Sequence, residues 1–312
     1  MKIFNLGSVN IDHVYRLDHF VMPGETIACT SYASFAGGKG FNQTVALARA
    51  KASVVHIGAV GEDGKALLET LEREAVDISA IEMVRHVPTG HGIIQVNAEG
   101  QNCIIIAAGA NAVPTPDSVA KALEAAEPGD ILLAQNETTA IADAMRIAHE
   151  KGMRVALNPA PMNGRVMTLP LELIDFLIVN EIEGAELLRL RGRVSTLPPE
   201  AVLQGLHELF PKAQVVLTLG SEGVMAVDAC GRVVKAAAFQ VKAVDTTAAG
   251  DTFTGFYLAS VARGDAMETA LRQASAAATI SVTRHGASPS VPFLAEVEAW
   301  LVGKGNEEGV CR

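Results

Sequence analysis

Short apolar runs that read as β-strands alternate with helical patterns along most of the sequence. The expected strands cover residues 3–9, 54–60, 78–84, 131–135, 155–158, 176–179 and 214–219. The expected helices include residues 64–75, 138–151, 181–190 and 267–284. Strands joined by helices pair in parallel, because a parallel connection must cross from one end of the sheet to the other. We therefore predict an α/β fold with a mostly parallel central sheet and helices on both faces.

Size and composition limit the class of protein. A chain of 312 residues with 49% hydrophobic and 19% charged residues is expected to form one large globular domain with a smaller addition. The net charge is −10, and Lys and Arg do not cluster, which argues against a nucleic-acid or anionic-membrane surface. Four widely separated cysteines form no CxxC pair, so neither a zinc site nor a disulfide framework is indicated.

Two segments depart from the alternating pattern. Residues 13–35 have no helical period and are broken at Pro23-Gly24, and residues 89–107 read as a hairpin around the turn at 97–100. We expect extended strands that lie off the main sheet. Asn10 and Asp12 follow the first strand and are placed to face a ligand at its carboxyl end, although both residue types also favour turns.

The stretch Asp245-Thr246-Thr247-Ala248-Ala249-Gly250-Asp251 has the pattern of an anion site. It follows an apolar, strand-like run at 239–244 and enters a helical pattern through Phe253. Three small residues at a helix N-terminus leave backbone N–H groups accessible to a phosphate. A carboxylate beside a phosphate needs a function, and Asp251 is suited to accept a proton from an attacking hydroxyl. The alternative is that Asp251 only caps the helix.

A second glycine-rich stretch, Gly37-Gly38-Lys39-Gly40-Phe41-Asn42-Gln43, precedes another helical pattern. It is not a Walker A loop, because no Gly-Lys pair here is followed by Ser or Thr at the required spacing. Taken alone, it could be only a tight turn.

Together the two stretches resemble the signatures of the ribokinase-like (PfkB-type) sugar kinases. The resemblance implies that Asp251 is the catalytic base and that Ala248, Ala249 and Gly250 form an anion hole. It also implies a small β lid over the carboxyl edge of the sheet. The sugar-binding residues that it implies are Asn10, Asp12, Gly38, Lys39, Gly40, Asn42, Glu137 and Asp251.

The same resemblance implies ATP, Mg²⁺ and K⁺ as cofactors. Glu183, in the pattern Asn180-x-x-Glu183, would hold Mg²⁺ through water. From the residues alone, Glu183 and Glu137 could instead be acidic residues that favour a helix start. The implied nucleotide-binding residues are Asn180, Thr218, Leu219, Gly220, Ser221, Glu222, Gly223, Gly250 and Ser275. The implied K⁺ site lies around Asp245, Thr247, Ser281, Arg284, Gly286 and Ser290.

We assign residues 1–12, 36–88 and 109–312 to the kinase domain and residues 13–35 and 89–108 to the lid. The resemblance also implies a homodimer, and the open lid leaves strand edges and one apolar face that a second copy could cover. The sequence runs from Met1-Lys2 directly into an apolar strand pattern, so we expect a cytoplasmic protein.

The reaction that the resemblance implies is transfer of the γ-phosphoryl of ATP to O5 of D-ribose. Phe41 stands where many of these kinases have a small residue, and Asn136 stands where an apolar residue is common, so 2-deoxyribose, another sugar or a nucleoside remains open. Ser275 stands where His or Asn is expected beside adenine, which leaves the nucleotide preference open. A catalytically silent sugar-binding or regulatory protein is the alternative from a different class.

Overall fold

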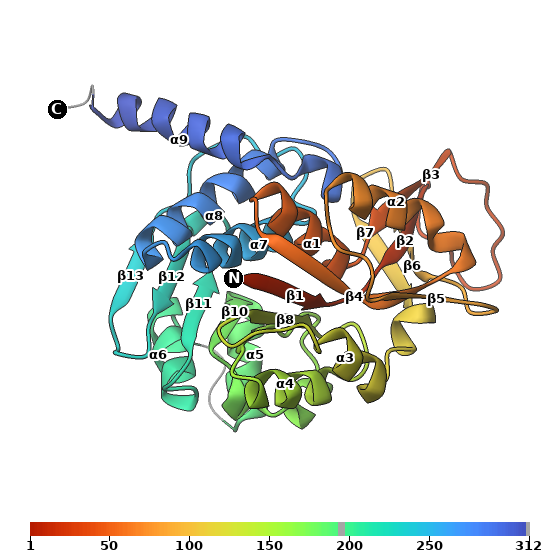
Figure 1. Ribbon diagram of the computed structural model, residues 1–312. Coiled ribbons are helices and arrows are strands. Elements are labelled where there is room, and N and C mark those ends of the chain that lie inside the picture. The colour runs from red at the N-terminus through yellow and green to blue at the C-terminus, as the bar shows by residue number, and fades with distance from the viewer. Residues whose placement is uncertain (193–196, 310–312) are drawn as a thin grey trace.

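The computed structural model of the chain describes residues 1–192 and 197–309, with residues 304–309 described by their backbone alone. A nine-stranded sheet runs through the centre, in the order β13-β12-β11-β10-β9-β8-β1-β4-β5 (Figure 1). Its strands are β1 (Lys2–Leu6), β4 (Ser53–Gly61), β5 (Ile81–Val84), β8 (Ile131–Gln135), β9 (Arg154–Asn158), β10 (Phe176–Asn180), β11 (Gln214–Thr218), β12 (Val224–Val227) and β13 (Val233–Ala236). From β5 to β11 all neighbours are parallel, whereas β12 and β13 pair antiparallel, so the predicted mostly parallel sheet is confirmed.

Helices cover both faces of this sheet (Figure 1). One layer contains α1 (Lys39–Arg49), α2 (Lys65–Arg73), α7 (Ala249–Arg263), α8 (Met267–Val282) and α9 (Leu294–Gly309). The other contains α3 (Pro116–Ala122), α4 (Ile141–Glu150), α5 (Glu181–Leu190) and α6 (Pro199–Leu209). Each layer buries its own apolar cluster against the sheet, as a doubly covered parallel sheet requires. No helix in the described ranges is long and apolar enough to cross a membrane.

The apolar run at 239–244 is not a strand, so that prediction was wrong. The backbone there has no regular pairing, and Phe239 packs edge-on against Trp300 with ring centroids 4.6 Å apart. The side chains of this run are apolar because they pack against other apolar groups and line a groove, and not because they belong to a β-sheet. The strands nearby are β12 and β13, which the sequence reading did not predict.

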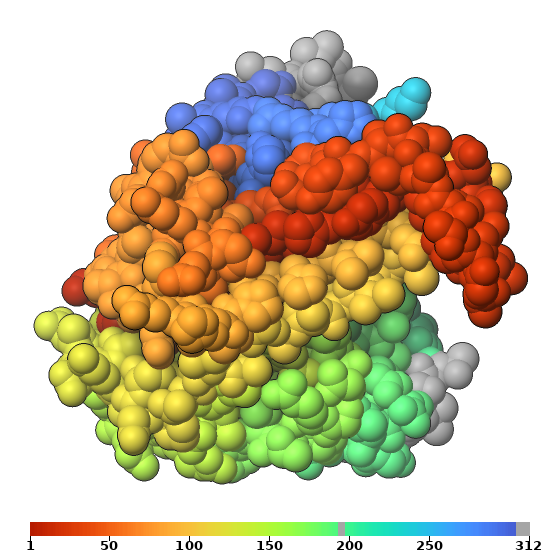
Figure 2. Space-filling view, turned by 90° about the vertical axis from the view of Figure 1, so that its right-hand side faces the viewer, coloured from red at the N-terminus to blue at the C-terminus, as the bar shows by residue number. Residues whose placement is uncertain are grey.

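A second sheet of four strands lies beside the main sheet, in the order β3-β2-β6-β7. Its strands are β2 (Asn10–Arg16), β3 (Ser31–Gly37), β6 (Gly90–Val96) and β7 (Asn102–Ala107). The extended segments and the hairpin turn predicted for 97–100 are present, with Gly100 in the positive-φ conformation at 77°. Figure 2 shows the face of the molecule that carries this sheet, with the red N-terminal part projecting from the body.

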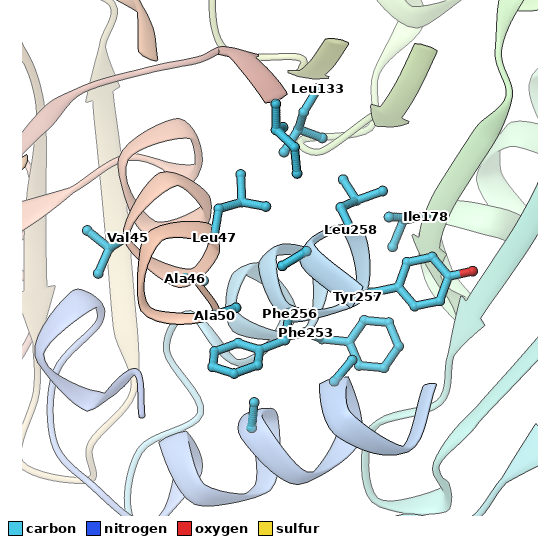
Figure 3. Close-up of a cluster of buried hydrophobic side chains, with 14 of the residues drawn as sticks. Val45, Ala46, Leu47, Ala50, Leu133, Ile178, Phe253, Phe256, Tyr257 and Leu258 are labelled. Carbon is cyan, nitrogen blue, oxygen red and sulfur yellow. The ribbon is translucent and has the colours of Figure 1, made fainter. Parts of the chain in front are cut away.

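Helices α1 and α7 pack closely enough that one glycine sets their separation. A Cβ atom added to Gly255 would meet the backbone nitrogen of Leu47 at 2.9 Å and would come closer still to the Cβ of Ala46. Figure 3 shows Leu47 and Ala50 on the side of α1 that faces α7, near Phe256 of α7, whereas Val45 points away from α7. The contact matters for the site, because each helix carries polar site residues at its N-terminal end.

Candidate active site

The carboxyl ends of the parallel strands bring polar residues to one edge of the sheet. The strand order reverses around β1, which pairs with β4 on one side and with β8 on the other. Ligands of open α/β sheets bind in the crevice at such a switch point. Asn158, Asn180 and Thr218 end the neighbouring strands β9, β10 and β11 at the same edge.

Asp251 lies in the first turn of α7 and is 9% exposed. The helix is capped by Ala248 in the left-handed conformation, with φ 59°, and no side chain provides a cap hydrogen bond. The Asp251 carboxylate instead accepts hydrogen bonds from Gln43 Nε2 at 2.9 Å and from Asn42 Nδ2 at 3.1 Å. The capping interpretation of Asp251 is therefore wrong, and the carboxylate is held by α1.

A pocket of about 250 Å³ opens at the start of α7, and we call it the phosphate pocket after the anion site predicted there. Lys39, Glu183, Gly250 and Asp251 are among its lining residues. A Cβ atom added to Gly250 would meet nothing within 4 Å, so space for a ligand lies directly at the helix N-terminus. The amide of Ala249 has a weak acceptor in the Thr246 carbonyl at 3.3 Å. An anion in this pocket would meet the positive end of the helix dipole.

Lys39 brings a positive charge to this pocket. The negative charge of Asp251 raises the pKa of the Lys39 ammonium, burial opposes that rise, and Glu137 and Glu183 add to it. The backbone N–H of Lys39 donates to Glu137 Oε2 at 3.0 Å. The side chain therefore lies beside the predicted base and the phosphate pocket, whereas its backbone contacts a predicted sugar-binding residue.

Asn180 and Glu183 form a capping box at the start of α5. Asn180 Oδ1 accepts from the Glu183 backbone N–H at 2.8 Å, and Glu183 Oε2 accepts from the Asn180 N–H at 3.0 Å. Burial raises the pKa of the Glu183 carboxyl, while the hydrogen bond to Asn180 and the charge of Lys39 act against that rise. The helix-start interpretation of Glu183 is thus correct for its Oε2 atom, which takes part in the capping box. Asn180 and Glu183 also line the phosphate pocket.

Asp12 lies on β2 of the second sheet, where two glycines make room for it. A Cβ atom on Gly92 would come within 2.9 Å of Asp12 Oδ1, and one on Gly37 would overlap the carboxylate. Burial, and then the charge of Glu137, raise the pKa of Asp12 to about 6. Asn10 starts the same strand, and its Oδ1 accepts from Asn111 Nδ2 at 2.7 Å.

Glu137 follows β8 and joins it to the segment after β1 and to the start of α1. Its Oε2 accepts from Ser8 Oγ at 2.5 Å as well as from the Lys39 N–H. Helix α4 begins only at Ile141, so Glu137 is not a first-turn residue of that helix, and the helix-start interpretation is wrong for it.

A second groove, of about 290 Å³, adjoins the phosphate pocket and shares Thr218, Thr246, Ala249 and Gly250 with it. Of the predicted nucleotide-binding residues, the groove is also lined by Gly220, Ser221, Gly223 and Ser275. Leu219 and Glu222 do not line it: Leu219 packs against the apolar core, and the Glu222 side chain is exposed. Asn180 lines only the phosphate pocket.

The predicted K⁺-binding segments are brought together by Asp245. Its Oδ1 accepts from the Thr247 N–H and its Oδ2 from the Gly286 N–H, both at 2.9 Å. The hydroxyl of Ser290 donates to a backbone carbonyl, that of Ser281 does the same, and Arg284 pairs with Glu296. A hydroxyl that donates its hydrogen keeps its lone pairs, so these loops can offer hydroxyl oxygens as well as backbone carbonyl oxygens to a cation. The described residues include no cluster of three or more His, Cys, Asp or Glu able to hold a metal.

Several site residues were not predicted from the sequence. Ser8, Asn111, Gln43 and Asn158 all make hydrogen bonds to predicted site residues or to one another, and all are buried. Their signal in the sequence was a polar residue inside or beside an apolar strand or helix pattern.

Comparison with known proteins places this geometry in a family. Residues 1–294 match the pfkB family carbohydrate kinases. A ribokinase of Haemophilus influenzae is 37% identical over 303 residues, which cover 95% of this chain and 97% of that protein. A ribokinase structure from Cryptococcus neoformans var. grubii in complex with ADP has a TM-score of 0.87 at 33% identity, covering 96% of this chain and 99% of the other.

A ribokinase structure from Arabidopsis thaliana, complexed with ribose and ATP, has a TM-score of 0.83 at 29% identity and covers 96% of this chain and 97% of the other. The chain belongs to the PfkB family of carbohydrate kinases and is a phosphotransferase with the ribokinase-like fold.

Proposed function

We propose that this kinase transfers the γ-phosphoryl of ATP to O5 of D-ribose, giving ribose 5-phosphate and ADP. The observation that carries the proposal is the position of Asp251. Its carboxylate lines the phosphate pocket and also accepts a hydrogen bond from Asn42, a predicted sugar-binding residue. The similarity to ribokinases over nearly the whole chain supports ribose as the acceptor.

In the proposed reaction Asp251 accepts the proton of the sugar hydroxyl as O5 bonds to the γ-phosphorus. The bond from that phosphorus to the β,γ-bridging oxygen breaks, and its electron pair leaves with ADP. Amides at Ala248, Ala249 and Gly250 stabilise charge on the transferring group, and Lys39 adds a positive charge beside it. The Gly250 amide contributes more than that of Ala249, because the Ala249 amide is partly engaged by the Thr246 carbonyl.

The sugar is proposed to bind between Asp12 and Asn42. The Oδ1 of Asn42 is buried without a hydrogen-bond partner among the described residues, which a sugar hydroxyl would satisfy. Asp12, Asn10 and Glu137 add oxygen acceptors from the lid and from the segment after β8. Gly38, with φ 89°, and Gly40 bring the backbone of α1 against the end of β1, where no side chain would fit.

ATP is proposed to lie along the two adjoining pockets, with its phosphates toward Gly250 and its base in the groove next to Ser275. Phe253, Ala278 and Val282 give that groove apolar surfaces suited to a base. Ser275 supplies a small hydroxyl there.

Mg²⁺ would be held through water near Glu183 and Asn180, whose oxygen atoms suit a hard cation. When bound, it neutralises charge on the ATP phosphates. K⁺ would be bound by carbonyl oxygens of the loops that Asp245 joins, where it would order the start of α7. Omitting Mg²⁺, and replacing K⁺ by Na⁺, tests each ion by its effect on turnover.

The second sheet is proposed to form a homodimer contact. The pairing places Phe35, Ile104 and Ile106 on the same face as Asp12, and the three are 46%, 49% and 59% exposed. Exposed apolar residues on an open sheet favour association with a second copy. Light scattering should give twice the chain mass, and Ile104→Lys should give the monomer.

A substrate panel tests the proposed acceptor. ADP release would be measured with ATP, Mg²⁺ and K⁺ while D-ribose, 2-deoxy-D-ribose, fructose and adenosine are offered separately. Turnover highest with ribose supports the proposal. Higher turnover with another acceptor keeps the phosphotransfer and assigns the specificity to the region of Phe41 and the lid. Binding of ribose without ADP release would support the silent sugar-binding alternative.

A further inference from the structure

Gln43 contacts Asp251 but lines neither the phosphate pocket nor the adjoining groove. It lies in the first turns of α1 and is fully buried. Its Nε2 donates to Asp251 Oδ1 at 2.9 Å and to Asn158 Oδ1 at 2.9 Å, and its Oε1 accepts from Gln135 Nε2 at 2.7 Å. All the hydrogen-bonding atoms of this amide are therefore in use.

The amide of Gln43 can take only one orientation. An ionised carboxylate only accepts hydrogen bonds, so the nitrogen of the amide must face Asp251. The oxygen then faces Gln135, which donates through Nε2 to both Gln43 Oε1 and Asn5 Oδ1, the latter at 2.9 Å. The Oε1 of Gln135 is buried without a partner among the described residues. Rotating the Gln135 amide by 180° would turn its oxygen toward Gln43 Oε1 and Asn5 Oδ1, which are both acceptors. The amide therefore keeps the orientation that leaves its own oxygen unpaired.

The far end of the network fixes Gln135 as a donor, because Asn5 donates through Nδ2 and so presents only its oxygen to Gln135. Asn5 Nδ2 donates to Thr44 Oγ1 at 2.7 Å, and Thr44 Oγ1 lies 2.7 Å from His56 Nδ1. Burial lowers the pKa of His56 to about 4, so the ring is neutral at pH 7. His56 Nε2 lies 3.2 Å from the Gly7 carbonyl, which places the proton on Nε2 and leaves Nδ1 to accept from Thr44. The donors therefore point outward from Gln135 in both directions. One branch runs through Asn5, Thr44 and His56 to the Gly7 carbonyl, and the other runs through Gln43 to the Asp251 carboxylate.

We propose that Gln43 is a positioning residue for the catalytic base, held in its donor orientation by the network through Gln135 and Asn5. With Oδ1 engaged by a core amide, the Asp251 carboxylate is fixed in rotation. Its Oδ2, on the side of Asn42, is left to receive the proton of the sugar hydroxyl. This inference rests on the proposed role of Asp251 as the base.

The charged groups around Asp251 do not take part in its hydrogen bond with Gln43. Lys39 on α1 and Glu183 on α5 face the carboxylate, and Glu137 faces Lys39. Gln43 is neutral, so replacing it by another neutral side chain leaves all of these charges in place. A change in the pH dependence would then report on the hydrogen bond to Asp251.

Two substitutions of Gln43 test the proposal through opposite effects of pH. Gln43→Met keeps the length and removes the donor, which disfavours the ionised carboxylate, so the ratio of its kcat to wild type should fall as pH falls. Gln43→Glu keeps the shape and can donate while protonated, but a second ionised carboxylate repels Asp251, so its ratio should fall as pH rises. We expect each kcat to drop by about 10- to 100-fold at its unfavourable pH, with the KM for ATP changed less than twofold.

Ser260→Ala is the matched control, because it removes the hydrogen bond that a buried hydroxyl of α7 donates to Asp265, and neither residue lines either pocket. It should lower thermal stability without changing kcat or its pH profile. Ratios for both Gln43 variants that do not change between pH 5.5 and 9, whatever their size, would overturn the proposal and leave Gln43 a structural residue. If Gln43→Met does not fold, the pH dependence of kcat for the isosteric Gln43→Glu decides alone whether the proposal stands. Full activity of Asp251→Asn would instead contradict the proposed base.

Discussion

Replacing Gly255 by alanine should slow catalysis by pushing helices α1 and α7 apart, although Gly255 itself lines neither pocket. The new methyl group would meet the Leu47 nitrogen at 2.9 Å and the Ala46 carbonyl carbon at 3.0 Å, with the Ala46 Cβ closer still. These atoms belong to backbone or to a Cβ, so no side-chain rotation relieves the contact. Because carbon atoms pack at about 3.5–4.0 Å, α1 and α7 must separate by roughly 1 Å.

That separation reaches the base, because Asp251 lies one helical turn before Gly255 and Gln43 lies one turn before Ala46 and Leu47. Hydrogen bonds of 2.9 and 3.1 Å to Asp251 would lengthen to about 4 Å, which is beyond hydrogen-bonding range. A misplacement of roughly 1 Å can lower kcat about 100-fold. Overpacking should also cost about 1–3 kcal/mol of stability, partly offset by the higher helix propensity of alanine, worth about 1 kcal/mol.

The assay compares kcat, KM and thermal unfolding of Gly255→Ala with those of Gly303→Ala. Gly303 lies in α9, is exposed, and a Cβ there would meet nothing within 4 Å. The control should gain stability slightly and keep its activity. If Gly255→Ala retains kcat within twofold of wild type, the spacing of α1 and α7 does not position the base, and the reasoning is refuted.

Three further substitutions give distinct outcomes. Asp12→Asn should stabilise the ligand-free protein at pH 7.5 by at most about 3 kcal/mol, because a folded-state pKa raised from 3.8 to about 6 makes ionisation of Asp12 destabilising as pH rises through that range. Its gain in melting temperature should shrink at pH 4.5, and an equal gain at both pH values would contradict this. Glu183→Gln retains a residue able to complete the capping box, so it should melt within about 1 °C of wild type while needing roughly 10-fold more Mg²⁺ for half-maximal activity. An unchanged Mg²⁺ requirement would remove Glu183 from the cation site. Tyr257→Phe should be neutral or stabilising by about 1–2 kcal/mol, because the Tyr257 hydroxyl is buried without a partner among the described residues. Clear destabilisation measured by chemical unfolding would mean that the hydroxyl is paired.

The sequence predicted the fold and the two chain segments that meet at the site. Alternating strand and helix patterns were sufficient for the parallel sheet, because buried parallel strands are continuous apolar runs. They failed at residues 239–244, where apolar side chains pack against Trp300 and line a groove rather than forming a strand. Periodicity reports that a residue is buried, and it does not say whether the backbone is paired.

The polar network could not be predicted, because it joins residues that are distant in the chain. Gln43 and Asp251 are separated by 208 positions, and Gln135 and Asn5 by 130. A polar side chain in an apolar pattern gives no indication of its partner, which the packing of α1 against α7 and the order of β1 and β8 determine. The capping interpretation of Asp251 is excluded by its hydrogen bonds to α1, which the order of residues in the chain does not reveal.

The role of Asp251 is tested most directly by measuring ADP release with ATP, Mg²⁺, K⁺ and D-ribose for the wild type and for Asp251→Asn. The substitution keeps the size of the side chain and removes its ability to accept a proton. The account predicts ribose-dependent turnover in the wild type and a loss of about 10²- to 10⁴-fold in kcat for Asp251→Asn, with ribose and ATP still bound. Wild-type activity in Asp251→Asn would contradict the assignment of this carboxylate as the base.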